Sequence, residues 1–116
     1  MIRFDDILEV YIVKGVTDLR KGIDRYTSII QELYQISPFQ DVLFIFCNRH
    51  RNKIKCPYWD GNVFWLLYKR LEKGHFQFPV REDGMTTITK QQLRWLLEGL
   101  KIEQKKAFET KIYKYA

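Results

Sequence analysis

The stretch that decides the fold is residues 42–71, VLFIFCNRHRNKIKCPYWDGNVFWLLYKRL. It opens with five apolar residues at 42–46, a run of the length expected for a strand in the middle of a sheet. Residues 48–52 are polar and predict a turn. Residues 53–59 then alternate between two faces, which is typical of a strand. One face carries Ile54, Cys56 and Tyr58, and the other carries Lys53, Lys55, Pro57 and Trp59.

Asp60-Gly61 is a strong signal for a β-hairpin, because both residue types favour tight turns. The hairpin predicts a returning strand over residues 63–71, although the apolar character of that segment is also compatible with a buried helix. The remaining strands are short and bounded by turn residues. We expect them at 75–80 and 85–88.

The N-terminal part predicts a strand followed by a helix. Residues 10–13, VYIV, are β-branched and aromatic and read as a strand. Thr17 or Asp18 offers a helix N-cap, and apolar residues recur at helical spacing from residue 19 to residue 36. Ser37-Pro38 should end this helix, because the residue before a proline is disfavoured in the α region.

A second helix is expected near the C-terminus. Thr89 and Gln92 have the spacing of a capping box, and Gly99 is placed to end the helix. The pattern predicts a small single α+β domain, residues 1–102, in which an antiparallel β-meander packs against two helices on one face of the sheet. Residues 103–116 are expected to form a basic tail, either helical or flexible.

The distribution of charge favours an anionic partner. The net charge is +6, and residues 47–74 alone carry seven Lys and Arg against two Asp and Glu. Residues 1–46 carry five against seven. No apolar run reaches the length of a membrane helix and the N-terminus does not resemble a secretory signal, so we expect a cytoplasmic protein that binds nucleic acid rather than a membrane.

Cations and aromatic rings in residues 47–74 provide the candidate binding surface. Cations can contact phosphates and an exposed ring can stack on a base. Trp59 is expected to be exposed on the strand face of the lysines, whereas Phe64 and Trp65 are expected in the core. The predicted contact residues are Arg49, Arg51, Lys53, Lys55, Trp59, Lys69, Arg70 and Lys73. Arg20, Lys21 and Arg25 are expected on a solvated helix face, and the alternative is that they add phosphate contacts beside the helix N-terminus.

The acidic residues do not predict a catalytic centre. A cluster of carboxylates could hold metal ions for phosphoryl transfer. Each candidate has a simpler explanation, because Asp18 and Asp24 lie where a helix is expected to begin and Asp60 and Asp83 precede turn glycines. We therefore predict no catalytic residue.

The thiols and imidazoles are equally weak candidates. Cys47 and His50 could form a nucleophile–base pair, but no third group is marked to orient them. Together with Cys56 and His75 they lack the spacing of a zinc site. We expect free thiols, no metal and no cofactor.

Four segments resemble a known family. They are TDLRKGID (17–24), LFIFCNRHRNKIK (43–55), YWDGNVFWLLYKRLEKGHF (58–76) and LRWLLEGL (93–100). In order and spacing they are similar to the TnpB-type accessory protein, encoded by the second open reading frame of a large bacterial insertion-sequence family. That protein is unrelated to the RNA-guided nuclease of the same name. Cys56-Pro57 and Phe78 depart from the family's pattern. The first departure argues against a required role for Cys56 as a ligand or nucleophile.

The resemblance implies a protein that assists transposition while a separate, larger transposase carries the catalytic carboxylates. The sequence then leaves two main hypotheses. The first is a non-catalytic factor that binds DNA, with the element ends as the expected target. The second is an adaptor that docks on the transposase through its aromatic face, with Trp59 as the anchor. A metal-dependent nuclease is a third and weaker alternative.

Overall fold

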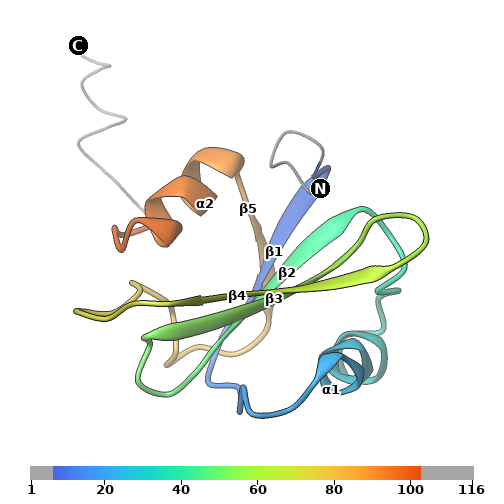
Figure 1. The fold of residues 1–116 in the computed structure, drawn as a ribbon, viewed down its shortest axis with the longest axis horizontal. Coiled ribbons are helices and arrows are strands. Elements are labelled where there is room, and N and C mark those ends of the chain that lie inside the picture. The colour runs from blue at the N-terminus through green and yellow to red at the C-terminus, as the bar shows by residue number, and fades with distance from the viewer. Residues whose placement is uncertain (1–6, 103–116) are drawn as a thin grey trace.

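The computed structural model describes residues 7–102, so the predicted tail at 103–116 lies outside the described residues. Five strands form one sheet in the order β4-β3-β2-β1-β5, and α1 and α2 lie on opposite sides of it (Figure 1). The predicted α+β class is confirmed. The elements are β1 (Glu9–Val13), α1 (Ile23–Ser28), a π-helical turn (Ile29–Leu33), β2 (Val42–Cys47), β3 (Lys53–Trp59), β4 (Phe64–Arg70), β5 (Met85–Ile88) and α2 (Lys90–Leu97).

The central strand β2 is buried along its whole length. Leu43, Ile45 and Cys47 face one hydrophobic core, which also includes Leu93 and Leu96 of α2. The other side chains of β2 face a second core beside α1, where they meet Tyr26. The prediction that both helices cover one face is wrong, because a strand that is apolar on both faces needs cover on both.

The sheet is a meander only over β2, β3 and β4. β1 pairs with β2 in parallel, from Glu9 opposite Val42 to Ile12 opposite Ile45, and β5 pairs antiparallel with the other edge of β1. Parallel neighbours require a crossover connection, which α1 provides between β1 and β2. The sheet is therefore antiparallel except for one pair.

The first helix begins later than predicted. Gly22 is its N-cap residue, and no side chain caps it. Asp18 instead accepts a hydrogen bond at 3.0 Å from the backbone N–H of Arg20, which closes a short turn before the helix. Leu19 lies in this turn and its side chain is buried in the core. It fits the helical spacing of apolar residues although it is not in the helix.

The predicted strand at 75–80 does not form. The N–H of Phe78 donates to the carbonyl of Phe76 at 2.9 Å, and the N–H of Val80 donates to Phe78 at 2.8 Å. Each bond joins residues two positions apart, so the backbone forms γ-turns and does not pair with a neighbouring strand. Phe76 and Phe78 are buried, which explains the alternation that resembled a strand.

The predicted signals of α2 are confirmed. Thr89 and Gln92 form both hydrogen bonds of a capping box. Gly99 has φ +80°, and the N–H of Leu100 donates to the carbonyl of Trp95 at 2.8 Å. This is a Schellman ending, for which glycine is the favoured residue. In residues 7–102 there is no helix with the length and apolar character needed to cross a bilayer.

Two buried tyrosines differ in how their hydroxyls are satisfied, which gives a matched test of packing. The Tyr26 hydroxyl is buried and has no hydrogen-bond partner among residues 7–102, whereas the Tyr58 hydroxyl donates to the Asp41 carboxylate. We expect Tyr26→Phe to leave the free energy of unfolding unchanged or to raise it by up to about 1 kcal/mol. Tyr58→Phe should lower it by about 1–2 kcal/mol, since it leaves Asp41 without that donor.

Urea denaturation of both variants and the parent chain measures this difference. A loss larger than about 1 kcal/mol in Tyr26→Phe would mean that its hydroxyl has a partner after all.

Candidate nucleic-acid interface

The register of the β3–β4 hairpin sorts the predicted contact residues between the two faces of the sheet. Lys53 lies opposite Arg70, and Lys55 lies opposite Tyr68. These four side chains share the face covered by α1, because Phe46, the cross-strand partner of Lys55, belongs to the core on that side. Part of the predicted surface is therefore assembled on one face.

The other predicted cations lie elsewhere. Lys69 is opposite Ile54 and so projects on the α2 face. Arg51 lines a separate hollow beside Phe78, and Lys73 is exposed in the segment after β4. The structure does not bring Arg51, Lys69 and Lys73 together with the lysines of β3.

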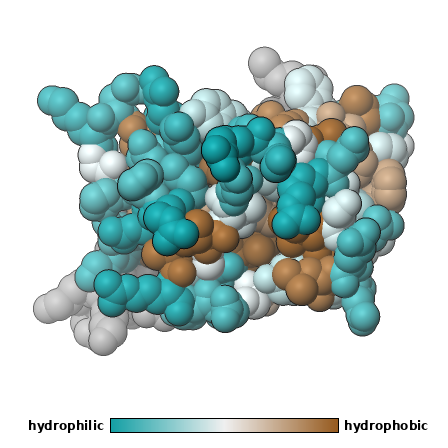
Figure 2. All heavy atoms as spheres, turned by 90° about the horizontal axis from the view of Figure 1, so that it is seen from below, coloured by the Kyte–Doolittle hydropathy of each residue, from teal (hydrophilic) through white to brown (hydrophobic). Residues whose placement is uncertain are grey.

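A groove on the α1 side collects Arg49, Lys53 and Lys55. Arg70 shares this face of the sheet but does not line the groove, and its Nε lies 2.9 Å from Oε2 of Glu72. The groove has a volume of about 980 Å³ and lies between residues 16–20, the turn at 48–50 and the strands β3 and β4. Figure 2 shows this side of the molecule, where hydrophilic side chains surround smaller apolar patches. We call it the basic groove; the residues that define it here are Arg20, Arg49, His50, Lys53, Lys55, Leu66 and Tyr68.

The charges within the basic groove are unequal. Arg20 is tied to Asp18, with Nη2 2.8 Å from Oδ2 and Nε 3.0 Å from Oδ1. The guanidinium holds the pKa of the Asp18 carboxyl well below its usual range, so the pair stays ionised and nearly cancels its own charge. The excess positive charge comes from Arg49, Lys53 and Lys55, which form no ion pair among the described residues.

The groove also contains an aromatic ring and an apolar side chain beside its cations. Nζ of Lys55 lies 5.8 Å from the centre of the Tyr68 ring, a cation–π distance. Tyr68 is 52% exposed, and Leu66 lies beside it on the same face of β4. The groove therefore offers cations for phosphates next to a ring and an apolar side chain for bases or sugars.

Sequence reasoning missed Arg20 as a member of this groove. The residue was expected on a solvated helix face, but it belongs to the loop that forms one wall. The pattern Asp18-x-Arg20 is the signal that could have indicated a local turn, because a carboxylate two residues before a backbone N–H often caps one.

The tryptophans occupy different places from those predicted. Trp65, expected in the core, is 40% exposed on the α2 face, and its indole N–H donates to Oδ2 of Asp60 at 2.7 Å. Trp59 is half-buried, with ring centroids 5.1 Å from Phe39 and 4.9 Å from Phe64. We call Phe39, Trp59 and Phe64 the aromatic cluster. Phe39, which the sequence did not single out, is 55% exposed.

The thiols are not arranged for catalysis. Cys47 and Cys56 are both buried, and burial raises the pKa of each thiol to about 12. His50 is exposed in the turn after β2. A thiol held in its neutral form is a poor nucleophile and a poor metal ligand.

The carboxylates are also dispersed. Within residues 7–102 no group of three or more His, Cys, Asp or Glu side chains is close enough to hold a metal ion. Asp60 is committed to the hairpin, where it accepts the Trp65 indole N–H and the backbone N–H groups of Asn62 and Val63. These hydrogen bonds, the indole first, lower the pKa of Asp60.

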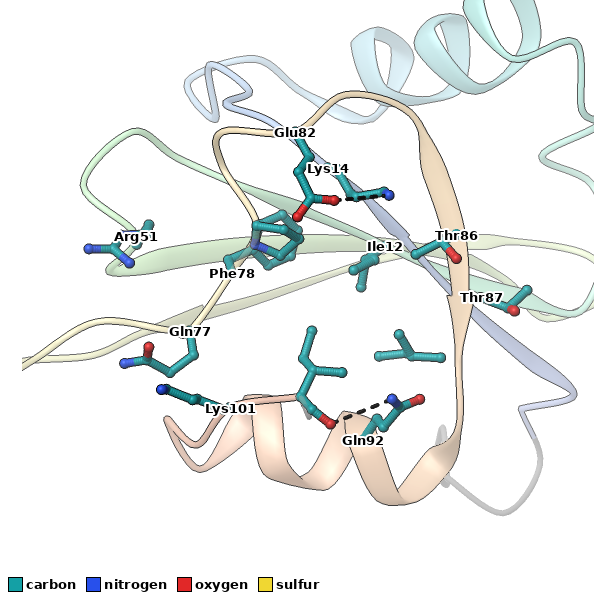
Figure 3. A pocket seen from close by; sticks show the side chains of 13 residues that line it. Ile12, Lys14, Arg51, Gln77, Phe78, Glu82, Thr86, Thr87, Gln92 and Lys101 are labelled. Carbon is teal, nitrogen blue, oxygen red and sulfur yellow. Dashed lines mark hydrogen bonds and ion pairs between the residues drawn. The ribbon is translucent and has the colours of Figure 1, made fainter. Parts of the chain in front are cut away.

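A second hollow of about 830 Å³ lies on the α2 side, between β1, β5 and residues 77–82 (Figure 3). Lys14 and Glu82 face each other across its rim with Nζ 3.2 Å from Oε1. The Gln92 side chain reaches the carbonyl of Ile102 at 3.5 Å. The ion pair cancels the charge of Lys14, which is one of three cations that line the hollow; the others are Arg51 and Lys101.

These features define a small basic α+β domain with a cationic groove on one face and an aromatic cluster on the same face. Comparison with known proteins assigns the family. The chain belongs to the IS66 Orf2-like proteins, whose family pattern matches residues 8–107. It is accordingly an accessory protein associated with an insertion sequence, as the resemblance of the four segments predicted.

Two curated relatives come from Sinorhizobium fredii (strain NBRC 101917 / NGR234). The protein y4hO is 34% identical over 93 residues, which cover 80% of this chain and 81% of y4hO. The protein y4jC is 27% identical over 93 residues, covering 80% of each chain. Both are described as uncharacterized. No solved structure matches the chain.

The buried thiols give a prediction of reactivity and of pH dependence. We expect both to resist a chromogenic disulfide reagent at pH 8 in the folded protein and to react fully in denaturant. An exposed Lys73→Cys variant is the control and should add one rapidly reacting thiol. Rapid reaction of the native thiols in the folded state would contradict their burial.

The same pKa shifts predict a loss of stability at high pH. In the unfolded chain a thiol ionises near pH 8.5, whereas the buried thiols keep their protons until about pH 12. The stabilising difference is therefore complete below pH 8.5, and the free energy of unfolding should fall as the pH rises from about 9 toward 12. Urea titrations across this range measure the slope.

Proposed function

We propose that the protein is a non-catalytic accessory factor of transposition that binds DNA through the basic groove. The observation that carries the proposal is the convergence of Arg49, Lys53 and Lys55 on one concave surface. None of the three is neutralised by an ion pair among the described residues. Such a surface attracts a polyanion. When its cations neutralise the phosphates of a nucleic acid, the counterions condensed on the nucleic acid are released.

The composition of the groove favours DNA over a small anion. The groove lies between residues 16–20, the turn at 48–50 and the strands β3 and β4, and Tyr68 and Leu66 contribute apolar surface to it. A lone phosphate has no apolar group to contact Tyr68 and Leu66, whereas a nucleotide chain presents phosphates, sugars and bases together. The element ends are the natural target for a protein of an insertion sequence.

The test is a DNA titration at about 50 and 200 mM salt with the double variant Lys53→Ala/Lys55→Ala. We expect the affinity to fall and the slope of log K against log salt to decrease by about 2 for a duplex, because each phosphate contact contributes about 0.9. Lys73→Ala removes an exposed cation that lies outside the basic groove and is the matched control. It should leave the slope nearly unchanged.

Two outcomes would reject the proposal. One is the absence of binding to element-end DNA at the lower salt concentration. The other is a loss of affinity in Lys73→Ala as large as the loss for the two groove lysines together.

The aromatic cluster supports a second candidate function, docking on the transposase of the same element. Phe39 is 55% exposed and Val63, in the adjacent hairpin loop, is 48% exposed, although both are large and apolar. Exposed aromatic residues packed on one another are typical anchors of protein interfaces. The cluster and the basic groove share one face, so one protein could hold DNA and transposase together.

Co-purification with the transposase after nuclease treatment tests the docking candidate. We expect Phe39→Ser to reduce recovery at least about tenfold, a loss of about 1.4 kcal/mol in binding free energy. Leu100→Ser is the control, because Leu100 is also exposed (44%) but follows α2 on the other side of the sheet. Equal losses in both variants would indicate a non-specific effect of surface hydrophobicity.

A further inference from the structure

β4 is an edge strand with an uninterrupted ladder on one side only. All seven of its residues are in register with β3, from Phe64 opposite Trp59 to Arg70 opposite Lys53. In the described sheet no strand lies on its other side. The opposite edge of the sheet, β5, has only four residues.

The hydrogen-bonding phase of β4 follows from the two ends of the hairpin. The N–H of Leu71 donates to Asn52 at 2.8 Å, and the N–H of Asp60 donates to Val63 at 3.1 Å. Alternate residues of an antiparallel strand bond to the same neighbour. The odd-numbered residues of β4 therefore bond to β3, and the backbone groups of Phe64, Leu66, Tyr68 and Arg70 point to the open edge.

This edge lacks most of the usual protection, although Lys69 and Arg70 place two charges near its C-terminal end. β4 contains no proline or glycine, and its ladder with β3 contains no bulge. Trp65 and Tyr68, on opposite faces, are 40% and 52% exposed. A long, regular edge with exposed aromatic residues is a template for another strand.

We propose that β4 pairs antiparallel with β4 of a second copy of this chain, about a twofold axis at Leu67. In this register all seven residues are paired. The backbone N–H and C=O groups at the open edge of one copy bond to those of the other copy. Phe64 faces Arg70 of the second copy, and Leu66 faces Tyr68 of the second copy. The pairing forms up to about eight backbone hydrogen bonds and makes a symmetric interface from one surface.

The side chains are self-complementary in this register. Lys69 faces Trp65 of the second copy, whose indole is held by a carboxylate, Asp60, that forms no ion pair among the described residues. Lys69 likewise forms no ion pair among residues 7–102. The cation thus meets both an aromatic ring and a negative charge. Like charges are not directly opposed within the paired strands.

The twofold axis stands perpendicular to the joined sheet, so the α1 faces of both copies lie on the same side. Two basic grooves would then face the same way. The dimer does not depend on DNA binding, because the edge and the groove use different groups of β4, the backbone and the side chains.

A cysteine at the axis tests the proposal. At a non-hydrogen-bonded pair the Cα atoms are about 4.5 Å apart, within the range of disulfides. We expect Leu67→Cys to form a covalent dimer under mild oxidation. The native thiols provide a silent background, because both are buried.

The register has its own control. Lys69→Cys alone should not cross-link, because the two copies of residue 69 lie on opposite sides of the axis. An equimolar mixture of Lys69→Cys and Trp65→Cys chains should cross-link, since these positions face each other. Failure of folded Leu67→Cys to cross-link, or self-linking of Lys69→Cys at the same rate, would overturn the proposal.

Leu67 packs partly against the core, so Leu67→Cys could also affect folding. A charge change at an exposed residue tests the dimer without altering the core. Lys69→Glu should weaken self-association at least about tenfold in sedimentation experiments. Lys73→Glu makes the same charge change beyond the paired residues and should have little effect. A parent chain that sediments as a monomer at the cross-linking concentration would also reject the dimer.

Discussion

The structure depends on the burial of both faces of β2. This strand has no polar side chain, and all six residues are excluded from water. Removing such a strand from water on one face only would leave an apolar surface exposed on the other. One helix on each side, a neighbouring strand on each edge and a crossover from β1 through α1 are the arrangement that meets this requirement.

The same constraint determines where polar chemistry can occur. Near β2 both faces of the sheet belong to the two cores, so charged side chains are found on the outer hairpin. There the alternation of β3 and β4 assigns Lys53 and Lys55 to the α1 side and Lys69 to the other. Pro57 lies within β3 although β3 is not an edge. Its missing N–H faces β2, at a point where the ladder between the two strands is interrupted.

Local signals in the sequence were sufficient for much of this architecture. The capping box of α2, its glycine ending, the Asp60-Gly61 hairpin and the buried β2 could each be read from residues a few positions apart. The basic groove could be predicted only in part. Lys53 and Lys55 share a face by simple alternation, but Arg20 joins them through a loop whose path depends on tertiary packing.

The errors have a common physical origin. Leu19, Phe76 and Phe78 are buried residues in irregular segments, and a buried side chain produces the same periodicity whether or not its backbone is in a helix or strand. The exposure of Trp65 has the opposite cause. Its indole N–H is satisfied by Asp60 at the surface, so a large ring that would be expected inside is held outside by one polar bond.

The place of β1 between β2 and β5 has a consequence for the order in which the molecule can assemble. Val10 pairs with Ile88, so the first strand to be synthesised has to wait for the last one. On the ribosome, the meander of β2, β3 and β4 can form while β1 still lacks one neighbour and the α2 side of the sheet is uncovered. Because α2 follows β5 directly, the segment that supplies the second neighbour of β1 also supplies the cover of the α2 side. Completion of the sheet therefore requires contact between distant parts of the chain and cannot proceed by growth from the N-terminus alone.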